Sequence, residues 1–105
     1  MGNLVAKYDV VAAASTYNTW NLSESGSAVN ISLVNMSIVP TNLAAPCNVI
    51  VILQRNGIDY ELFNESLAAG DKLYDNTTRT IFAADKLIVQ VSAPVYLTIF
   101  GSWFT

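Results

Sequence analysis

Residues 29–39 read Val-Asn-Ile-Ser-Leu-Val-Asn-Met-Ser-Ile-Val and carry the clearest structural pattern in the chain. Apolar and polar side chains alternate along them, which is typical of a β-strand with one face on a core and one in water. The alternation slips by one residue at Leu33-Val34. A slip inside a long strand predicts a β-bulge or a crossing between sheets. The run ends at Pro40.

The next apolar run, Asn48 to Leu53, is rich in β-branched residues and too short to favour a helix, so it predicts a central strand. Asn56-Gly57 follows it. This dipeptide favours a type I′ hairpin turn, in which both central residues have positive φ. The return strand is expected from Ile58 to Phe63, with its side chains alternating between two faces.

Further short strands are expected on both sides of this hairpin. They cover Asn3–Val11, Thr16–Leu22, Lys72–Tyr74, Arg79–Phe82, Lys86–Val91 and Val95–Trp103. About eight short strands separated by turn residues are typical of a sandwich or barrel. We predict a single all-β domain over residues 1–105, an antiparallel β-sandwich of jelly-roll-like type.

The composition is unusual in its shortage of charge. Of the 105 residues, 52% are hydrophobic and only 12% are charged. A domain of this size cannot bury so many apolar side chains, so some are expected to contact other subunits. The net charge of −3 and five scattered basic residues disfavour a nucleic-acid partner and a membrane surface. No apolar stretch approaches the length of a membrane-spanning helix.

The residues that usually carry chemistry are missing or isolated. The chain has no histidine and one cysteine, Cys47, for which we expect a buried, inert thiol. No Ser-His-Asp triad, zinc site, calcium loop or phosphate-binding loop can be assembled from the motifs present. We therefore predict no enzyme, no catalytic residue, no metal ligand and no cofactor. Asp71 and Asp85 each follow small residues, and we expect them to cap turns.

Five Asn-X-Ser/Thr sequences occur, beginning at Asn21, Asn30, Asn35, Asn64 and Asn76. They would accept glycans only in a secreted protein, and no secretory signal is evident at the N-terminus. We interpret these residues as the polar half of alternating strands.

Aromatic residues gather near both ends of the sequence, and aromatic side chains often anchor subunit interfaces. The predicted interface residues are Trp20, Tyr96, Phe100, Trp103 and Phe104. Two other roles remain open for them, namely filling of the core and stacking against a sugar.

From about residue 28 the chain resembles a family of small β-sandwich virion proteins of tailed bacteriophages. The resemblance rests on Tyr60-Glu61-Leu62-Phe63, on Ser66 to Leu73 and on Phe82 to Ala93, which follow a turn, strand, turn and strand order. The chain departs from the family in having Ala84 where glycine is expected, and in the aromatic tail Gly101 to Thr105.

The resemblance implies a particle component without catalytic residues. We expect a capsid decoration (cement) protein that is made in the host cytoplasm and bridges subunits on the capsid surface. Its partners would be the major capsid protein or other virion proteins, together with further copies of itself in a small homo-oligomer such as a trimer. The alternatives are a neck, baseplate or tail-fibre component, and a carbohydrate-binding module that uses Tyr and Trp.

Overall fold

The computed structural model describes residues 3–13, 17–18 and 30–104. These residues form nine β-strands and no helix. The strands are β1 (Asn3–Val11), β2 (Tyr17–Asn18), β3 (Asn30–Pro40), β4 (Cys47–Arg55), β5 (Ile58–Leu67), β6 (Leu73–Asp75), β7 (Arg79–Ile81), β8 (Lys86–Val91) and β9 (Val95–Phe104). Of the strand predicted at Thr16–Leu22, only Tyr17–Asn18 lies among the described residues.

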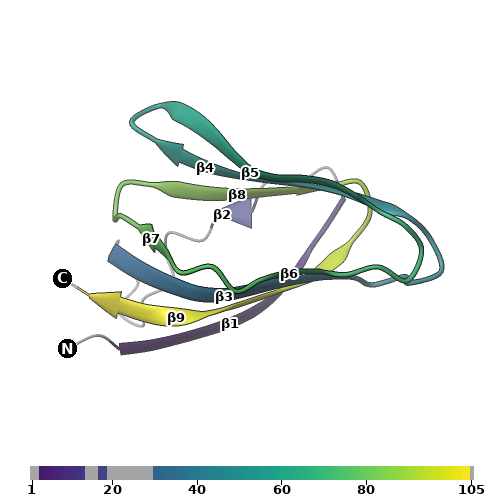
Figure 1. Cartoon of the computed structure of the whole chain (residues 1–105), viewed down its shortest axis with the longest axis horizontal. Helices are drawn as coiled ribbons and strands as arrows, with labels where there is room; N and C mark the ends of the chain where they lie inside the picture. Colours follow the sequence, from purple (N-terminus) through teal and green to yellow (C-terminus); the bar gives the residue numbers. More distant parts are fainter. Residues whose placement is uncertain (1–2, 14–16, 19–29, 105) are drawn as a thin grey trace.

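The strands lie in two antiparallel sheets packed face to face, as Figure 1 shows. The first sheet has the order β1-β9-β3-β6, with β7 also paired to β3, and the second has the order β2-β8-β4-β5. Each connection crosses between the sheets, except the β4–β5 hairpin and the step from β6 to β7. Since β6 and β7 pair with successive parts of β3, they act as one interrupted strand. The order confirms the predicted jelly-roll-like sandwich.

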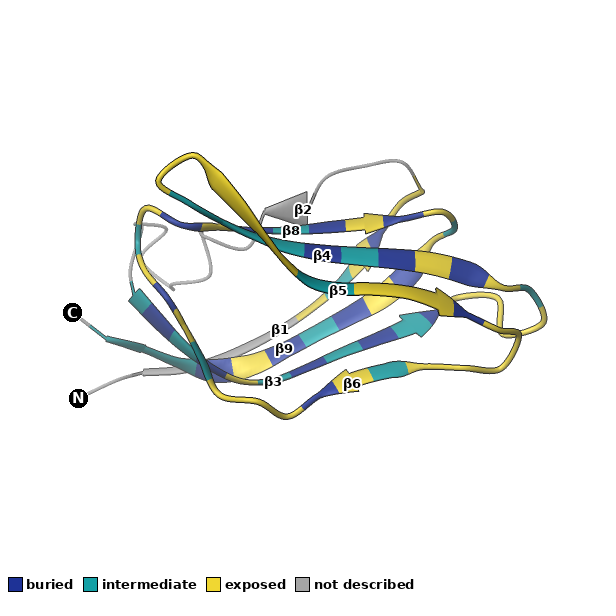
Figure 2. Cartoon of the chain, turned by 45° about the horizontal axis from the view of Figure 1, so that its top comes forward, coloured by how far each residue is buried: buried dark blue, intermediate teal, exposed yellow. Residues whose placement is uncertain are grey.

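Alternating burial along β3, β4, β8 and β9 builds the core between the sheets (Figure 2). In β8, Leu87, Val89 and Val91 are buried, as the sequence predicts. The core is otherwise formed by the inward residues of β3, β4 and β9 and by a few flanking positions, namely Val11, Ile31, Leu33, Met36, Ile38, Cys47, Val49, Val51, Leu67, Ile81, Val95, Leu97 and Ile99.

The predicted slip in residues 29–39 is a bulge between Leu33 and Asn35, where β3 pairs with β9. Gly101 lies opposite Leu33 at this point. A Cβ on Gly101 would collide with the carbonyl oxygen of Ser32 and would touch the Leu33 Cα at 3.1 Å. The bulge therefore requires glycine in β9, since only glycine lets the two backbones approach so closely.

The hairpin turn is confirmed, because Asn56 has φ of 54° and Gly57 has φ of 75°. One feature of this hairpin was not predicted. The register of β4 and β5 shifts between Val51 and Ile52, which leaves Leu62 as an extra residue in β5. As a result, the neighbouring residues Leu62 and Phe63 both pack against the core.

Candidate interaction surface

The outer face of the first sheet gathers large apolar side chains from both ends of the chain. Val10 of β1 lies opposite Tyr96 of β9, and Tyr8 lies opposite Thr98. In β3, Ser37 pairs with Thr98 on one side and with Tyr74 of β6 on the other. Directly opposed residues share a face. We call Tyr8, Val10, Tyr74, Tyr96 and Phe100 the tyrosine face.

These five side chains remain open to solvent in the single chain. Tyr8 and Tyr74 are each 61% exposed, and Tyr96, the least exposed, is still 37% exposed. The described positions between them in β3 and β9 carry Asn35, Ser37, Val39 and Thr98, none of which is charged. An exposed, uncharged and aromatic surface matches the core of a protein–protein interface, from which charged residues are depleted.

The second sheet presents a different outer face. Lys86, Ile88 and Gln90 alternate with the buried residues of β8 and therefore point outward. They lie opposite Gln54, Ile52 and Ile50 of β4. Here a charge and amide groups separate the aliphatic side chains, and no aromatic residue occurs among these positions. The tyrosine face is therefore the stronger candidate for contact with a partner.

The structure divides the predicted interface residues. Tyr96 and Phe100 lie on the tyrosine face. Trp103 is paired with Ile31 and packs, partly buried, against the core, and its interface role stays a prediction. Its indole N–H is buried without a hydrogen-bond partner among the described residues. Phe104 is half-buried at the end of β9, and Trp20 lies outside the described residues.

Sequence reasoning missed Tyr8, Val10 and Tyr74. A partial signal existed for the first two, because Tyr8 and Val10 flank Asp9 with the spacing of two residues on one face of a strand. They lie beside Tyr96 because β1 pairs with β9, and this pairing brings the two ends of the chain together.

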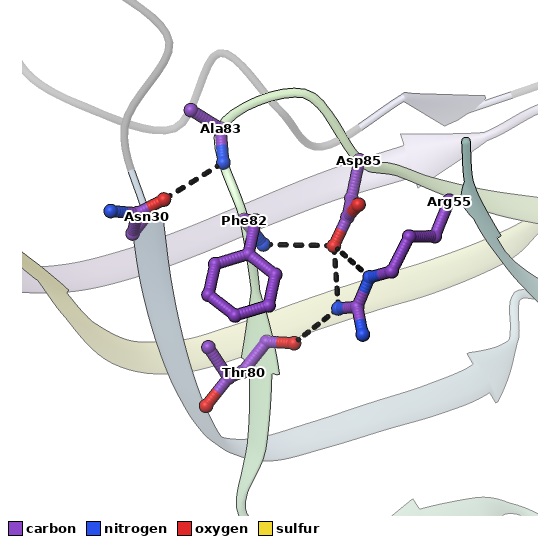
Figure 3. Close-up of polar contacts among 6 residues, drawn as sticks. All are labelled: Asn30, Arg55, Thr80, Phe82, Ala83 and Asp85. Atoms are coloured by element: carbon purple, nitrogen blue, oxygen red, sulfur yellow. Dashed lines mark hydrogen bonds and ion pairs between the residues drawn. The ribbon is translucent and has the colours of Figure 1, made fainter.

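An ion pair joins the buried Asp85 to the half-buried Arg55 (Figure 3). Arg55 donates to the Asp85 carboxylate from Nε at 2.9 Å and from Nη2 at 2.6 Å, and the Phe82 N–H donates to the same oxygen at 2.9 Å. Arg55 also donates to the Thr80 carbonyl at 3.1 Å, so its guanidinium joins β4 to β7 across the two sheets.

The environment of Asp85 favours its charged form. Burial by itself raises the pKa of Asp85, but the hydrogen bonds from Arg55 and Phe82 and the Arg55 charge outweigh it, so the pKa lies below its usual value. This carboxylate therefore stays ionised and caps the turn before β8 by accepting the Phe82 N–H. The prediction that Asp85 caps its turn is confirmed. Asp71 does the same, accepting from the Ala68 N–H at 3.2 Å.

A second pair, Asp75 and Arg79, stabilises the step between β6 and β7. Arg79 Nε donates to Asp75 at 3.0 Å, and the Thr77 N–H donates to its other oxygen at 3.1 Å. Burial by itself raises the pKa of Asp75. The hydrogen bonds and the Arg79 charge lower it by more than burial raises it, so the pKa lies below its usual value. Both aspartates are engaged in structural contacts.

The described residues contain no group of three or more potential metal ligands and form no surface pocket. Cys47 is buried, as predicted, with its thiol 3.6 Å from the Ala93 carbonyl oxygen. No helix among these residues is long and apolar enough to cross a membrane.

A scan against models of known protein families finds no match to this chain, and a search of curated proteins finds none either.

Proposed function

We propose that this chain is a structural subunit of a tailed-phage virion, a capsid decoration protein that attaches to the shell through its tyrosine face. One observation carries the proposal: five large apolar side chains lie exposed on one sheet face without a charge among them. The major capsid protein is the proposed partner. The resemblance in the turn-and-strand order and the jelly-roll topology, which also occurs in viral capsid domains, support this assignment.

The physics of attachment is burial of the tyrosine face. Buried apolar area contributes roughly 25 cal/mol per Å², so one small face binds modestly by itself. Repetition of the contact over the shell, and linkage of copies into a small homo-oligomer, would raise the overall avidity. The protein would be made in the host cytoplasm and would become part of the virion on the capsid surface.

A place in the neck, baseplate or tail fibre uses the same contacts and differs only in position. Imaging separates these locations. A short epitope is inserted in the exposed β3–β4 loop (residues 41–46), and virions carrying this copy are labelled and imaged. We expect label distributed over the capsid. Label at one vertex or along the tail would reassign the protein within the virion, and purified virions without the chain would overturn the proposal.

The carbohydrate-binding alternative has its own measurement. The exposed rings of Tyr8, Tyr74 and Tyr96 could stack against sugar rings, whereas Trp103 is packed on the inner side. Calorimetric titration with a panel of oligosaccharides is expected to show no saturable heat. A saturable affinity that is lost in Tyr96→Ala and kept in Gln90→Ala would favour the sugar-binding module over the structural subunit.

A further inference from the structure

The outermost strand of the second sheet, β5, has a free edge beside the hairpin turn. Among the described residues β5 pairs only with β4. The pairing is regular from Ile58 to Glu61, and the register shifts beyond Glu61. We call residues 58–61 the hairpin edge. A free strand edge offers main-chain groups to which an extended segment of another chain can bond.

The geometry of the turn assigns the free main-chain groups to Asp59 and Glu61. Arg55 and Ile58 flank a two-residue turn of type I′, so they form a hydrogen-bonded pair. Hydrogen-bonded and non-hydrogen-bonded pairs alternate along an antiparallel ladder. Tyr60 is therefore bonded to β4, whereas the N–H and C=O groups of Asp59 and Glu61 point away from β4.

The side chains of the hairpin edge differ between the two faces of the sheet. Asp59 and Glu61 lie opposite outward residues of β4, so their exposed carboxylates are on the outer face. Tyr60 lies opposite Leu53, which packs against the core, yet 49% of Tyr60 is exposed. The edge thus presents two carboxylates on one face and an uncovered ring on the other.

The two carboxylates keep their negative charge. Gln54 donates to Asp59 from Nε2 at 3.0 Å, and it separates Asp59 from Lys86 of β8. Neither Asp59 nor Glu61 forms an ion pair with another residue in the described part of the chain. The hairpin edge is therefore complementary in charge to a basic strand.

We propose that the hairpin edge binds an extended, antiparallel segment of a partner protein in which one apolar residue separates two basic residues. The basic residues lie opposite Asp59 and Glu61, and the apolar residue lies opposite Tyr60. In strand addition of this kind, main-chain hydrogen bonds provide affinity and alternate side chains provide specificity. The inference goes beyond the virion assignment and does not use the tyrosine face, because the hairpin edge belongs to the other sheet.

The charge of the edge disfavours a second copy of the hairpin edge as the partner. In an antiparallel pair centred on Tyr60, Asp59 of each copy would lie opposite Glu61 of the other. Like charges directly opposed in a sheet are destabilising, and charged edges commonly prevent self-pairing. Two charges of one sign still permit pairing with a strand of the opposite sign, which makes the edge selective.

No segment of this sequence has the basic-apolar-basic pattern. The basic residues nearest to one another in sequence, Lys72, Arg79 and Lys86, are seven positions apart. The residues outside the described part of the chain include no lysine or arginine, and they include the acidic Glu24. The complementary segment is therefore expected in a different protein.

A pair of short peptides tests the pattern. The probe is acetyl-Val-Lys-Val-Lys-Val-amide, and the control, acetyl-Val-Glu-Val-Glu-Val-amide, keeps the length and the apolar residues and reverses the charge. In NMR titrations of the whole chain, the probe should bind about tenfold more tightly than the control. Bound probe should slow hydrogen exchange at the amides of Asp59 and Glu61. The amide of Tyr60, which is already bonded to β4, should exchange as before.

Charge variants test the location. Glu61→Lys and Glu65→Lys make the same change of charge at exposed positions of β5. Glu65 lies roughly 13 Å along the strand from Glu61, beyond the screening length of about 8 Å at physiological salt. Glu61→Lys should bind the probe about tenfold more weakly than the parent chain, and Glu65→Lys should stay within about twofold of it. The double variant Asp59→Lys/Glu61→Lys should prefer the acidic peptide. Circular dichroism verifies folding of each variant.

Equal binding of the two peptides by the parent chain would overturn the proposal. Equal weakening in Glu61→Lys and Glu65→Lys would also overturn it, because the probe would then respond to overall charge and not to the edge. Slowed exchange at Tyr60 in place of Asp59 and Glu61 would contradict the assigned strand pairing. If a charge variant does not fold, the peptide pair and the exchange measurement on the parent chain still decide.

Discussion

The ring of Tyr8 in β1 stacks on the ring of Tyr96 in β9, with centroids 5.7 Å apart and planes inclined by 21°. The two residues are diagonal neighbours, because Tyr8 is opposite Thr98 and Val10 is opposite Tyr96. Such a stack contributes about 0.5–1.5 kcal/mol beyond simple burial. Each ring therefore restricts the rotamers of the other, which would lower the entropy lost on binding the proposed partner.

Gly101 should be among the residues least tolerant of change. In Gly101→Ala the new methyl group meets the backbone of Ser32 and not a movable side chain. We expect the free energy of unfolding to fall by about 2–3 kcal/mol, measured by urea denaturation. Ser102→Ala, at the next residue, should change it by less than about 0.5 kcal/mol. Equal effects of the two substitutions would contradict the close approach at the bulge.

Asp85→Ala should destabilise the fold more than Asp71→Ala. Asp85 is buried and accepts hydrogen bonds from a guanidinium and an amide, so we expect Asp85→Ala to lower the free energy of unfolding by about 2–3 kcal/mol. Asp71 is exposed and accepts one hydrogen bond from a backbone amide at 3.2 Å, so Asp71→Ala should lower the free energy of unfolding by less than about 1 kcal/mol. Thermal unfolding of both variants measures the difference, and an equal loss would exclude the assigned role of Asp85.

Stability should decline in acid through Asp75 and Asp85. The pKa of each is below its usual value in the folded chain, so the unfolded chain binds these protons at a higher pH. The free energy of unfolding should therefore fall as the pH drops below about 4, until the pH passes the lowered folded pKa values. Urea midpoints from about pH 6 to about pH 2 measure this dependence.

The double variant Asp75→Asn/Asp85→Asn should show a flatter dependence on pH than the parent chain, although it is less stable at neutral pH. If the free energy of unfolding of the double variant falls with pH as steeply as that of the parent chain, other carboxylates cause the acid sensitivity.

The local features of the fold could be predicted from the sequence because their causes are local. Alternation placed β8 at Lys86–Val91, the phase slip at Leu33-Val34 marked the bulge, and Asn56-Gly57 marked the hairpin. The extra residue at Leu62 was missed, since adjacent Leu62 and Phe63 give no break in an apolar pattern.

The candidate surface could be predicted only in part. The outward positions of Tyr96 and Phe100 follow from alternation in β9, and the same rule places Trp103 on the core side with Ile99. Tyr8 joins the surface through pairing between the two ends of the chain. Tyr74 belongs to a strand of 3 residues, too short for its direction to be inferred from a pattern.

Binding of charge-matched variants to particles tests the central claim, that the tyrosine face is the contact surface. Phe100→Lys and Gln90→Lys each add one positive charge to an exposed strand position, on the outer faces of the first and second sheets. Their affinity is measured by sedimentation with virions lacking the chain. We predict that Phe100→Lys binds about 30-fold more weakly than the parent chain and that Gln90→Lys binds normally. Equal binding of both variants would contradict the account.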